Sequence, residues 1–278
     1  MADGRITVLV ENTAGRGGLL GEHGLSFWIE LDGTEVLFDT GQGHVLARNA
    51  RQLAIRLDHV DAIVLSHGHY DHTGGLAEAL KVAWRPRVYA HPAAFGPKYA
   101  RNRDGTARHV GMPDIDEPEV RRHAELVWVE DPMEVCPRFH VTGPIPRVAG
   151  FEDTGGAFFE DPQCTTPDEL VDDQAAFIET SVGTVVLLGC AHAGIINTLQ
   201  YIQWLTHGRP IHTVIGGTHL VNAGDERMEK TIAALRRLEV SRLLPCHCTG
   251  FAAAARLWCE FPARCAGCAT GTVVEIPG

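Results

Sequence analysis

Five strand-like runs of this chain end on or next to a histidine, and this feature constrains the fold more than any other. The histidines are His67, His91, His192, His219 and His247, although the chain has only 15 histidines in 278 residues. In open α/β folds, ligands gather at the carboxyl ends of the strands. We therefore expect an α/β fold in which histidines far apart in the sequence converge at one edge.

The order of the apolar segments supports an α/β fold. The first forty residues are typical of β structure, with strands predicted over 5–12, 25–31 and 35–41 and a hairpin turn at Asp32-Gly33, and a helix follows over 45–55. Further strands are predicted over 61–67, 86–91, 183–192, 212–219, 241–247 and 271–276, and helices over 74–83, 92–100, 194–205, 225–238 and 252–261. The apolar runs 62–65 and 185–188 are typical of strands buried on both faces.

Two segments, 95–123 and 151–174, break this alternation. Both are turn-rich, the first with several basic residues and the second acidic. Long loops of this kind inside a compact domain are usually functional or mobile. The sequence shows no linker and no shift in composition, so we expect a single domain over residues 1–278.

The segment HGHYDH contains His67, His69, Asp71 and His72 directly after a predicted buried strand. Imidazole and carboxylate are the usual ligands of borderline-soft divalent cations. His67 and His69 alternate by two and can serve one cation, whereas Asp71 and His72 can serve a second. The alternative interpretation is a solvated, histidine-rich loop, and the full H-x-H-x-D-H pattern argues against it.

Charge and composition exclude several functions. The formal net charge of 24 − 35 = −11 disfavours nucleic acid and anionic membranes as partners. No apolar run approaches the roughly 18 residues of a membrane span, and the N-terminal MADGRITVLVEN lacks a signal-peptide pattern, so we expect a cytoplasmic protein. Most of the eight cysteines are then expected to be reduced, although a small site at Cys246, Cys248, Cys265 and Cys268 stays open.

The H-x-H-x-D-H motif, with LFDTG upstream, resembles the metallo-β-lactamase superfamily over nearly the whole chain. More narrowly, the segments LLGEHGLSFWIE, LFDTGQG, SHGHYDHTGGL, TGPIPR, DDQA, GCAHAGIIN, GGTHL and HCTG resemble the dihydropterin-ribofuranosylaminobenzene 5′-phosphate synthase-like branch. The resemblance implies an α/β fold of the αββα four-layer sandwich type, with a dinuclear metal site at one edge.

The resemblance also implies a set of metal ligands. His67 and His69 would hold one metal, Asp71 and His72 the other, and His192 and His247 would complete the two sites; His219 is a further candidate, either as a ligand or as a substrate contact. Two positions depart from the common pattern. The region TGPIPR offers no third histidine, and Cys190 or His192 stands where many members have a bridging aspartate. His91 is the weakest candidate, because it can simply start a helix.

Other residues are expected around the metals. Asp39 would accept a hydrogen bond from a metal-bound histidine. Asp71 and His219 are the candidate catalytic residues, and Arg147 and His23 the candidate substrate-binding residues. Phosphate recognition by basic residues also stays open, because arginine binds phosphate through two hydrogen bonds. Those residues are Lys98, Arg101, Arg103, Arg108 and Arg147.

Two divalent ions, with zinc expected and manganese or iron as alternatives, would supply a metal-bound hydroxide. The sequence therefore predicts a metal-dependent hydrolase or group-transfer enzyme for an ester-like or phosphorylated small molecule. A pterin-related synthase is an alternative, as is a metal-binding redox or regulatory protein without hydrolytic activity. A flavodiiron-type oxidoreductase is disfavoured, because it would be expected to carry glutamate at the position of His69.

Overall fold

Two β-sheets pack face to face in the computed structural model, which describes residues 2–102 and 104–278. The first sheet has the strand order β16 (Val273–Pro277), β1 (Ala2–Val10), β2 (Ser26–Leu31), β3 (Thr34–Phe38), β4 (Ala62–Val64), β5 (Arg87–Ala90) and β8 (Glu125–Trp128). The second has the order β15 (Arg242–Cys246), β14 (Ile211–Gly217), β13 (Gly183–Leu188), β12 (Ala175–Thr180), β10 (Phe139–Val141) and β9 (Met133–Cys136). Phe27 and Ile29 of the first sheet share one apolar core with Ile178 and Leu187 of the second.

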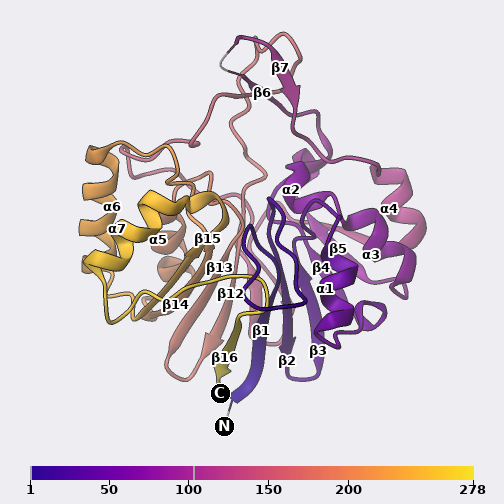
Figure 1. Cartoon of the computed structure of the whole chain (residues 1–278), viewed down its shortest axis with the longest axis horizontal. Helices are drawn as coiled ribbons and strands as arrows, with labels where there is room; N and C mark the ends of the chain where they lie inside the picture. Colours follow the sequence, from indigo (N-terminus) through magenta and orange to yellow (C-terminus); the bar gives the residue numbers. More distant parts are fainter. Residues whose placement is uncertain (1, 103) are drawn as a thin grey trace.

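Helices cover the outer face of each sheet (Figure 1). The first sheet carries α1 (Leu46–Gln52), α2 (Tyr70–Thr73), α3 (Leu76–Val82) and α4 (Glu117–His123), and the second carries α5 (Ile195–Leu205), α6 (Asp225–Arg237) and α7 (Phe251–Glu260). Each sheet–helix interface has an apolar core of its own. The layers therefore run helix, sheet, sheet, helix, which confirms the predicted αββα sandwich.

The predicted alternation of strands and helices is largely confirmed. Strands β3, β4, β5 and β8 are parallel, as are β13, β14 and β15. Both continuous apolar runs are buried throughout. At the predicted hairpin, Asp32 and Gly33 have φ values of 51° and 81°, which a turn between two adjacent strands requires. In the part of the chain that the structure describes, no helix is both long and apolar enough to cross a membrane.

The helix predicted over 92–100 is wrong. Only a short 3₁₀ turn, η2 (Pro92–Phe95), forms there, and it begins with the Ala93 N–H donating to His91 Nδ1 at 3.1 Å. Gly96 is extended because it precedes Pro97, which disfavours helical backbone at the residue before it. His91 therefore starts a turn, in keeping with its place as the weakest of the five histidines as a candidate metal ligand. Two further 3₁₀ turns are η1 (Leu57–His59) and η3 (His247–Thr249).

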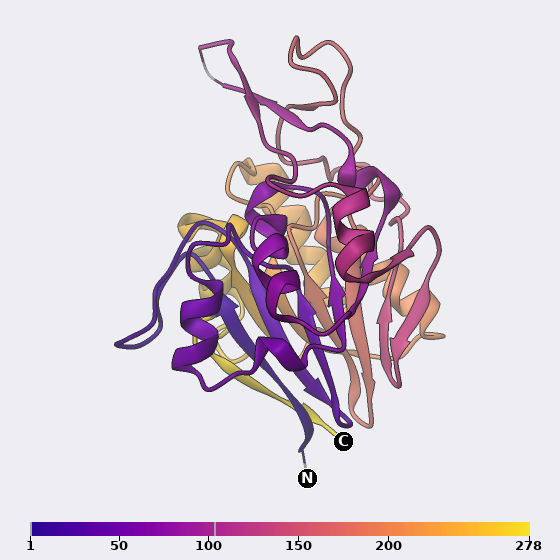
Figure 2. The ribbon, with the colours of Figure 1, turned by 90° about the vertical axis from the view of Figure 1, so that its right-hand side faces the viewer.

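The two segments expected as loops pair with each other. Strand β6 (Tyr99–Arg101) pairs on one side with β7 (Ala107–His109) and on the other with β11 (Phe158–Phe159). We call this three-stranded sheet the arm. It projects beyond the ends of the two large sheets, on the side opposite the two chain termini (Figures 1 and 2).

Candidate metal centre

The turn after β4 places three histidines and one carboxylate at the edge below the arm. His67 and His72 are fully buried, and His69 and Asp71 are nearly so. The tight path needs a glycine at position 68, since a Cβ there would lie 2.2 Å from the Ala94 carbonyl oxygen. After the turn the chain enters α2, which carries Asp71 and His72.

One donor set consists of His67, His69 and His192, whose candidate ligand atoms all lie within 4.8 Å of one another. His67 Nε2 lies 3.0 Å from His69 Nδ1, and His192 Nε2 is buried without a hydrogen-bond partner. His192 reaches this place from the turn after β13, where its Nδ1 donates to the Thr154 carbonyl at 2.8 Å. That hydrogen bond leaves Nε2 as the free lone pair.

The hydrogen bonds around His67 fix its tautomer in the same sense. Ser66 Oγ donates its only proton to Asp39 Oδ2 at 2.7 Å, so it accepts from His67 Nδ1 at 2.9 Å. The Nε2 of His67 then points inward as a lone pair. Burial lowers the pKa of His67 and His192 well below the ordinary value and that of His69 to about 3. All three rings are therefore neutral at pH 7, as cation binding requires.

The other donor set consists of Asp71, His72 and His247. His247 Nε2 lies 3.2 Å from His72 Nε2 and 3.4 Å from Asp71 Oδ2, and His72 Nε2 lies 4.0 Å from the same oxygen. His72 Nδ1 contacts Asp39 Oδ2 at 2.7 Å, and His247 Nδ1 contacts Asn12 Oδ1 at 3.0 Å. Asp39 therefore orients His72, and Asn12 does the same for His247.

The charges of this second set differ from those of the first. Burial opposes a charged His72, but the Asp39 carboxylate outweighs burial and raises the pKa of His72 to about 9. Burial also opposes a charged Asp71, but hydrogen bonds from His23 and His247 outweigh it and hold the pKa of Asp71 well below the ordinary value. A cation in this set would displace the proton of His72 and pair with an ionised Asp71.

Cys190 lies between the two donor sets. Its Sγ is 3.2 Å from His72 Nε2, and it groups with His67 and His72 as well as with His192. The sequence left Cys190 and His192 as alternatives for the bridging position. The structure separates them, since His192 joins the first set as its third histidine and Cys190 occupies the place between the sets.

Cys248 is a neighbour that the sequence did not single out for this centre. Its thiol donates to the Cys190 carbonyl at 3.6 Å, and its Sγ groups with Cys190 and His247. Gly217 makes room for it, because a Cβ there would lie 2.5 Å from Cys248 Sγ. The HCTG segment signals this position, since Cys248 directly follows His247. The other three members of the suggested cysteine site lie elsewhere, with Cys246 and Cys265 buried in apolar cores and Cys268 packed against one.

His219 lies beside the first donor set. Its ring centroid is 4.3 Å from that of His192, and its Nδ1 is buried without a partner. The turn that delivers it is left-handed, with a φ of 47° at His219. Gly155 packs directly on the ring, since a Cβ there would lie 1.9 Å from His219 Cδ2. The position suits either a ligand or a contact to a bound substrate.

A cavity of about 430 Å³ opens onto both donor sets. Its lining includes most of the predicted site residues together with arm residues. His23 stands at its mouth, with Nε2 3.1 Å from Asp71 Oδ2. Arg147 does not border it; it lines a separate cavity of about 240 Å³ with Asp173 and Ala193.

Of the basic residues expected to meet an anion, Arg108 is the one that the structure brings to this cavity. Lys98 is buried between Asp168 and Asp172, at 3.0 and 2.9 Å. The Arg101 guanidinium lies over the Phe159 ring. Arg103 lies outside the described residues.

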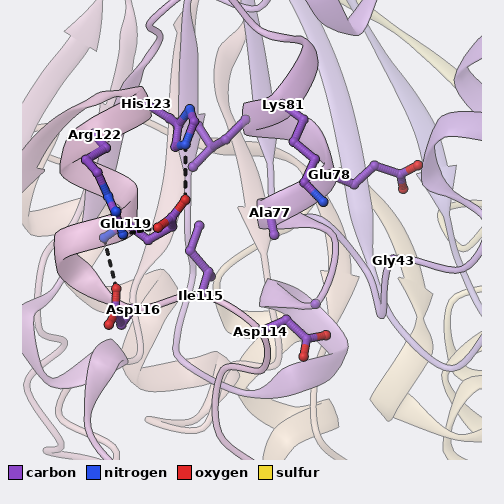
Figure 3. Close-up of a pocket in the computed structure, with 12 residues that line it drawn as sticks. Gly43, Ala77, Glu78, Lys81, Asp114, Ile115, Asp116, Glu119, Arg122 and His123 are labelled. Carbon is purple, nitrogen blue, oxygen red and sulfur yellow. Dashed lines mark hydrogen bonds and ion pairs between the residues drawn. The ribbon is translucent and has the colours of Figure 1, made fainter.

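A larger cavity of about 1090 Å³ lies elsewhere, between α3 and α4 (Figure 3). Its charged side chains mostly satisfy one another or the backbone, as where His123 Nε2 meets Glu119 Oε1 at 3.1 Å and Asp116 accepts from the Glu119 N–H at 2.9 Å. No histidine of the two donor sets lines it. Volume alone therefore does not identify the functional site.

Comparison with known proteins agrees with this geometry. Residues 20–247 match the family model of the metallo-beta-lactamase superfamily. The chain is 32% identical over 266 residues to the 7,8-dihydropterin-6-methyl-4-(beta-D-ribofuranosyl)-aminobenzene-5'-phosphate synthase of Methanocaldococcus jannaschii, covering 90% of this chain and 88% of that protein. It is also 32% identical over 254 residues to the uncharacterized protein MJ0448 of the same organism, covering 91% and 93%.

Solved structures show the same likeness. Tm1679, described as a metal-dependent hydrolase of the β-lactamase superfamily, has a TM-score of 0.85 and 32% identity, covering 99% of this chain and all of that one. A diphosphatase of the PhnP family has a TM-score of 0.54 at 14% identity, covering 98% of each chain, and shares the fold.

Proposed function

Because the chain belongs to the metallo-β-lactamase superfamily, we propose that it is a metal-dependent hydrolase or group-transfer enzyme acting on an ester-like or phosphorylated small molecule. One observation carries the proposal. Two adjacent donor sets turn imidazole nitrogens and the Asp71 carboxylate inward, and hydrogen bonds to Asp39, Asn12 and Thr154 orient three of the histidines from behind. When bound there, two divalent cations would polarise a carbonyl or phosphoryl oxygen and bring the pKa of water near neutrality.

The residues present fit such cations. The Nε2 atoms of His69 and His192 are buried without a partner, and His67 Nε2 lies 3.0 Å from His69 Nδ1. A cation among these nitrogens would supply the missing partners. The thiol of Cys190 between the sets favours zinc or iron over manganese, since thiolate is a soft ligand.

Two side chains can handle protons at the cavity. A hydrogen bond to Asp71 raises the pKa of His23, which keeps a proton available at the mouth. Burial opposes a charged His219, but the adjacent Cys248 outweighs it and raises the pKa of His219. In this proposal His219 either donates a proton to the leaving group or binds the leaving group. Asp71 holds the second cation.

Metal analysis tests the proposal most directly. We expect about two equivalents of transition metal per chain, and the double substitution His67→Ala with His72→Ala should remove most of it. His140→Ala is the matched control, because His140 stacks on Phe177 in a different part of the chain. A metal-free native protein that takes up no added metal would refute the proposal.

Activity separates an enzyme from a metal-binding redox or regulatory protein. Phosphodiester, phosphomonoester and lactone substrates should be screened with and without chelator. Chelator-sensitive turnover of any one supports hydrolysis. Metal occupancy without turnover of any of them would favour the non-hydrolytic alternative.

A pterin-related synthase is the second candidate, and the 32% identity to the Methanocaldococcus jannaschii synthase over 90% of this chain favours it. The same donor sets would then serve a group transfer. Incubation with a dihydropterin that carries a leaving group, together with a phosphorylated aminobenzene riboside, distinguishes the two candidates. Only the synthase would join the two molecules and release the leaving group.

A further inference from the structure

One face of the arm carries a row of three side chains from three different strands. Ala100 at the centre of β6 lies opposite Arg108 of β7 and opposite Phe158 of β11. Directly opposed residues of antiparallel strands share a face of the sheet. Phe158, Ala100 and Arg108 therefore form one row, which we call the arm row.

The neighbouring positions of β6 point to the other face, because side chains alternate along a strand. Arg101 illustrates this. Its guanidinium carbon lies 4.7 Å from the centroid of Phe159, and its Nη2 donates to the Cys164 carbonyl at 2.6 Å. The arm strands thus hold two exposed arginines that face opposite ways.

The arm row faces the metal centre. The Phe158 ring centroid lies 4.9 Å from that of His69 and 5.2 Å from that of His192. The Arg108 guanidinium carbon lies 6.0 Å from the centroid of Tyr70, the residue between His69 and Asp71. Both ends of the row line the cavity that opens onto the donor sets.

The charges of this cavity favour an anion. Among the described residues that line it, Arg108 is the one lysine or arginine and Asp71 the one carboxylate. Asp71 is already engaged by His23 and His247. The permanent charge left to meet a ligand is therefore the guanidinium, in a chain whose net charge is −11.

The spacing of the row sets the shape of the ligand. Strands lie roughly 4.8 Å apart, so the backbones at Arg108 and Phe158 are about 10 Å apart, with only the methyl group of Ala100 between them. A guanidinium binds an oxyanion through two parallel hydrogen bonds, and an aromatic ring packs on the edge or face of another ring.

We infer that the arm row selects substrates that carry an oxyanion beside an aromatic or apolar ring, with Arg108 on the anion and Phe158 on the ring. This inference rests on the proposed function and adds to it the class of substrate. Phosphate and carboxylate share the oxyanion chemistry, and the test below separates them.

The test measures dissociation constants by titration calorimetry on the metal-loaded protein. The probes are phenylphosphonate, benzoate and the neutral benzyl alcohol, and the variants are Arg108→Ala and the matched control Arg101→Ala. Arg108→Ala should raise the dissociation constant of one or both anionic probes about tenfold or more, since a hydrogen-bonded charge pair is lost. Arg101→Ala should leave them within about twofold. Direct contacts of a probe with the metals are common to both variants.

The pattern among the probes names the oxyanion. A larger loss with phenylphosphonate points to phosphate, and a larger loss with benzoate to carboxylate. Benzyl alcohol should bind equally to wild type and Arg108→Ala. Ala100→Leu fills the middle of the row. It should weaken the binding of both ring-bearing anions more than it weakens the binding of inorganic phosphate.

Three results would overturn the inference: no binding of either anion by the wild type, equal binding by Arg108→Ala, or equal losses in the two arginine variants. These results differ from a failure of the proposed function. A protein that binds the probes through Arg108 but turns over no substrate would keep the inference and lose the function. A chelator-sensitive hydrolase whose probe binding is unchanged by Arg108→Ala and by Ala100→Leu would keep the proposed function and refute the inference.

Discussion

At the scale of single residues, the buried carboxylate of Asp39 organises the centre without lining its cavity. Its Oδ1 accepts the Ser66 N–H at 2.7 Å, and its Oδ2 lies 2.7 Å from both Ser66 Oγ and His72 Nδ1. One side chain thus orients the ring of His72 directly and sets the tautomer of His67 through Ser66.

Asp39→Asn should therefore weaken metal binding roughly 10- to 100-fold, the usual effect of losing a carboxylate behind a metal-binding histidine. Competition with a chromophoric chelator measures this. Asp58→Asn is the control, because Asp58 pairs with Arg56 on the surface. Unchanged affinity in Asp39→Asn would show that His72 is oriented by other contacts.

Asp173 gives a pH-dependent prediction. Its Oδ2 accepts the Ala193 N–H at 2.8 Å, its Oδ1 has no partner, and burial raises its pKa to about 7. The native state therefore holds a proton that the unfolded state releases near pH 4, so this group lowers the free energy of unfolding as pH rises from about 4 to about 7. The full effect is on the order of 4 kcal/mol above pH 7, from ~1.4 kcal/mol per pKa unit.

Asp173→Asn removes this titration. The variant should gain stability over the wild type at pH 8 and lose most of that advantage at pH 5, as measured by urea unfolding at the two pH values. Glu169→Gln, an exposed neighbour on the same cavity, should show no such difference. A pH-independent difference for Asp173→Asn would mean that the carboxyl stays ionised when buried.

At the scale of elements, the sequence predicted the long strands and helices far better than the arm. The helix predicted over 225–238 appears as α6, and the continuous apolar run before His67 contains the buried strand β4. Strands β6, β7 and β11 have only two or three residues each, too few for a period to show, and β11 pairs with a strand more than 50 residues away. Phe158 could not be assigned to the site for the same reason.

The histidine motif could be found in the sequence because its four residues lie within six consecutive positions. The roles of Cys190 and His192 could not be predicted from the sequence. The two residues lie two positions apart, and only the turn after β13 decides which of them faces the first donor set. The short strands β8, β9 and β10, the six-residue strand β12 and helix α4 also escaped prediction.

Lys98 anchors the arm and gives a prediction at this scale. Buried between Asp168 and Asp172, it joins the start of β6 to the segment that follows β11, and Asp172 also accepts the Gly68 N–H at 2.7 Å. Lys98→Met leaves two buried carboxylates without a counter-charge and should lower the free energy of unfolding by about 3–5 kcal/mol.

Urea unfolding measures the effect, with Lys230→Met as the control, because its pair with Glu226 is exposed and such pairs contribute about 1 kcal/mol or less. Adding Asp168→Asn to Lys98→Met should recover part of the loss. A loss no larger than that of Lys230→Met would show that water reaches the carboxylates.

At the scale of the whole molecule, each donor set takes residues from both sheets. His67 and His69 follow β4 of the first sheet, and His192 follows β13 of the second; Asp71 and His72 likewise join His247, which follows β15. Cations in these sets would tie the two halves of the sandwich together at the edge below the arm.

A cation that binds only the folded chain stabilises it by mass action, by about 2.7 kcal/mol when its free concentration is 100 times the dissociation constant. We therefore expect the thermal midpoint to rise with buffered free zinc. His192→Ala, which removes the second sheet's donor from the first set, should flatten that rise, and His140→Ala should follow the wild type. Low buffered zinc matters because the unfolded chain exposes eight cysteines that also bind it and would mask the effect. A thermal midpoint of the wild type that does not change with free zinc would mean that the donor sets do not join the sheets through a cation.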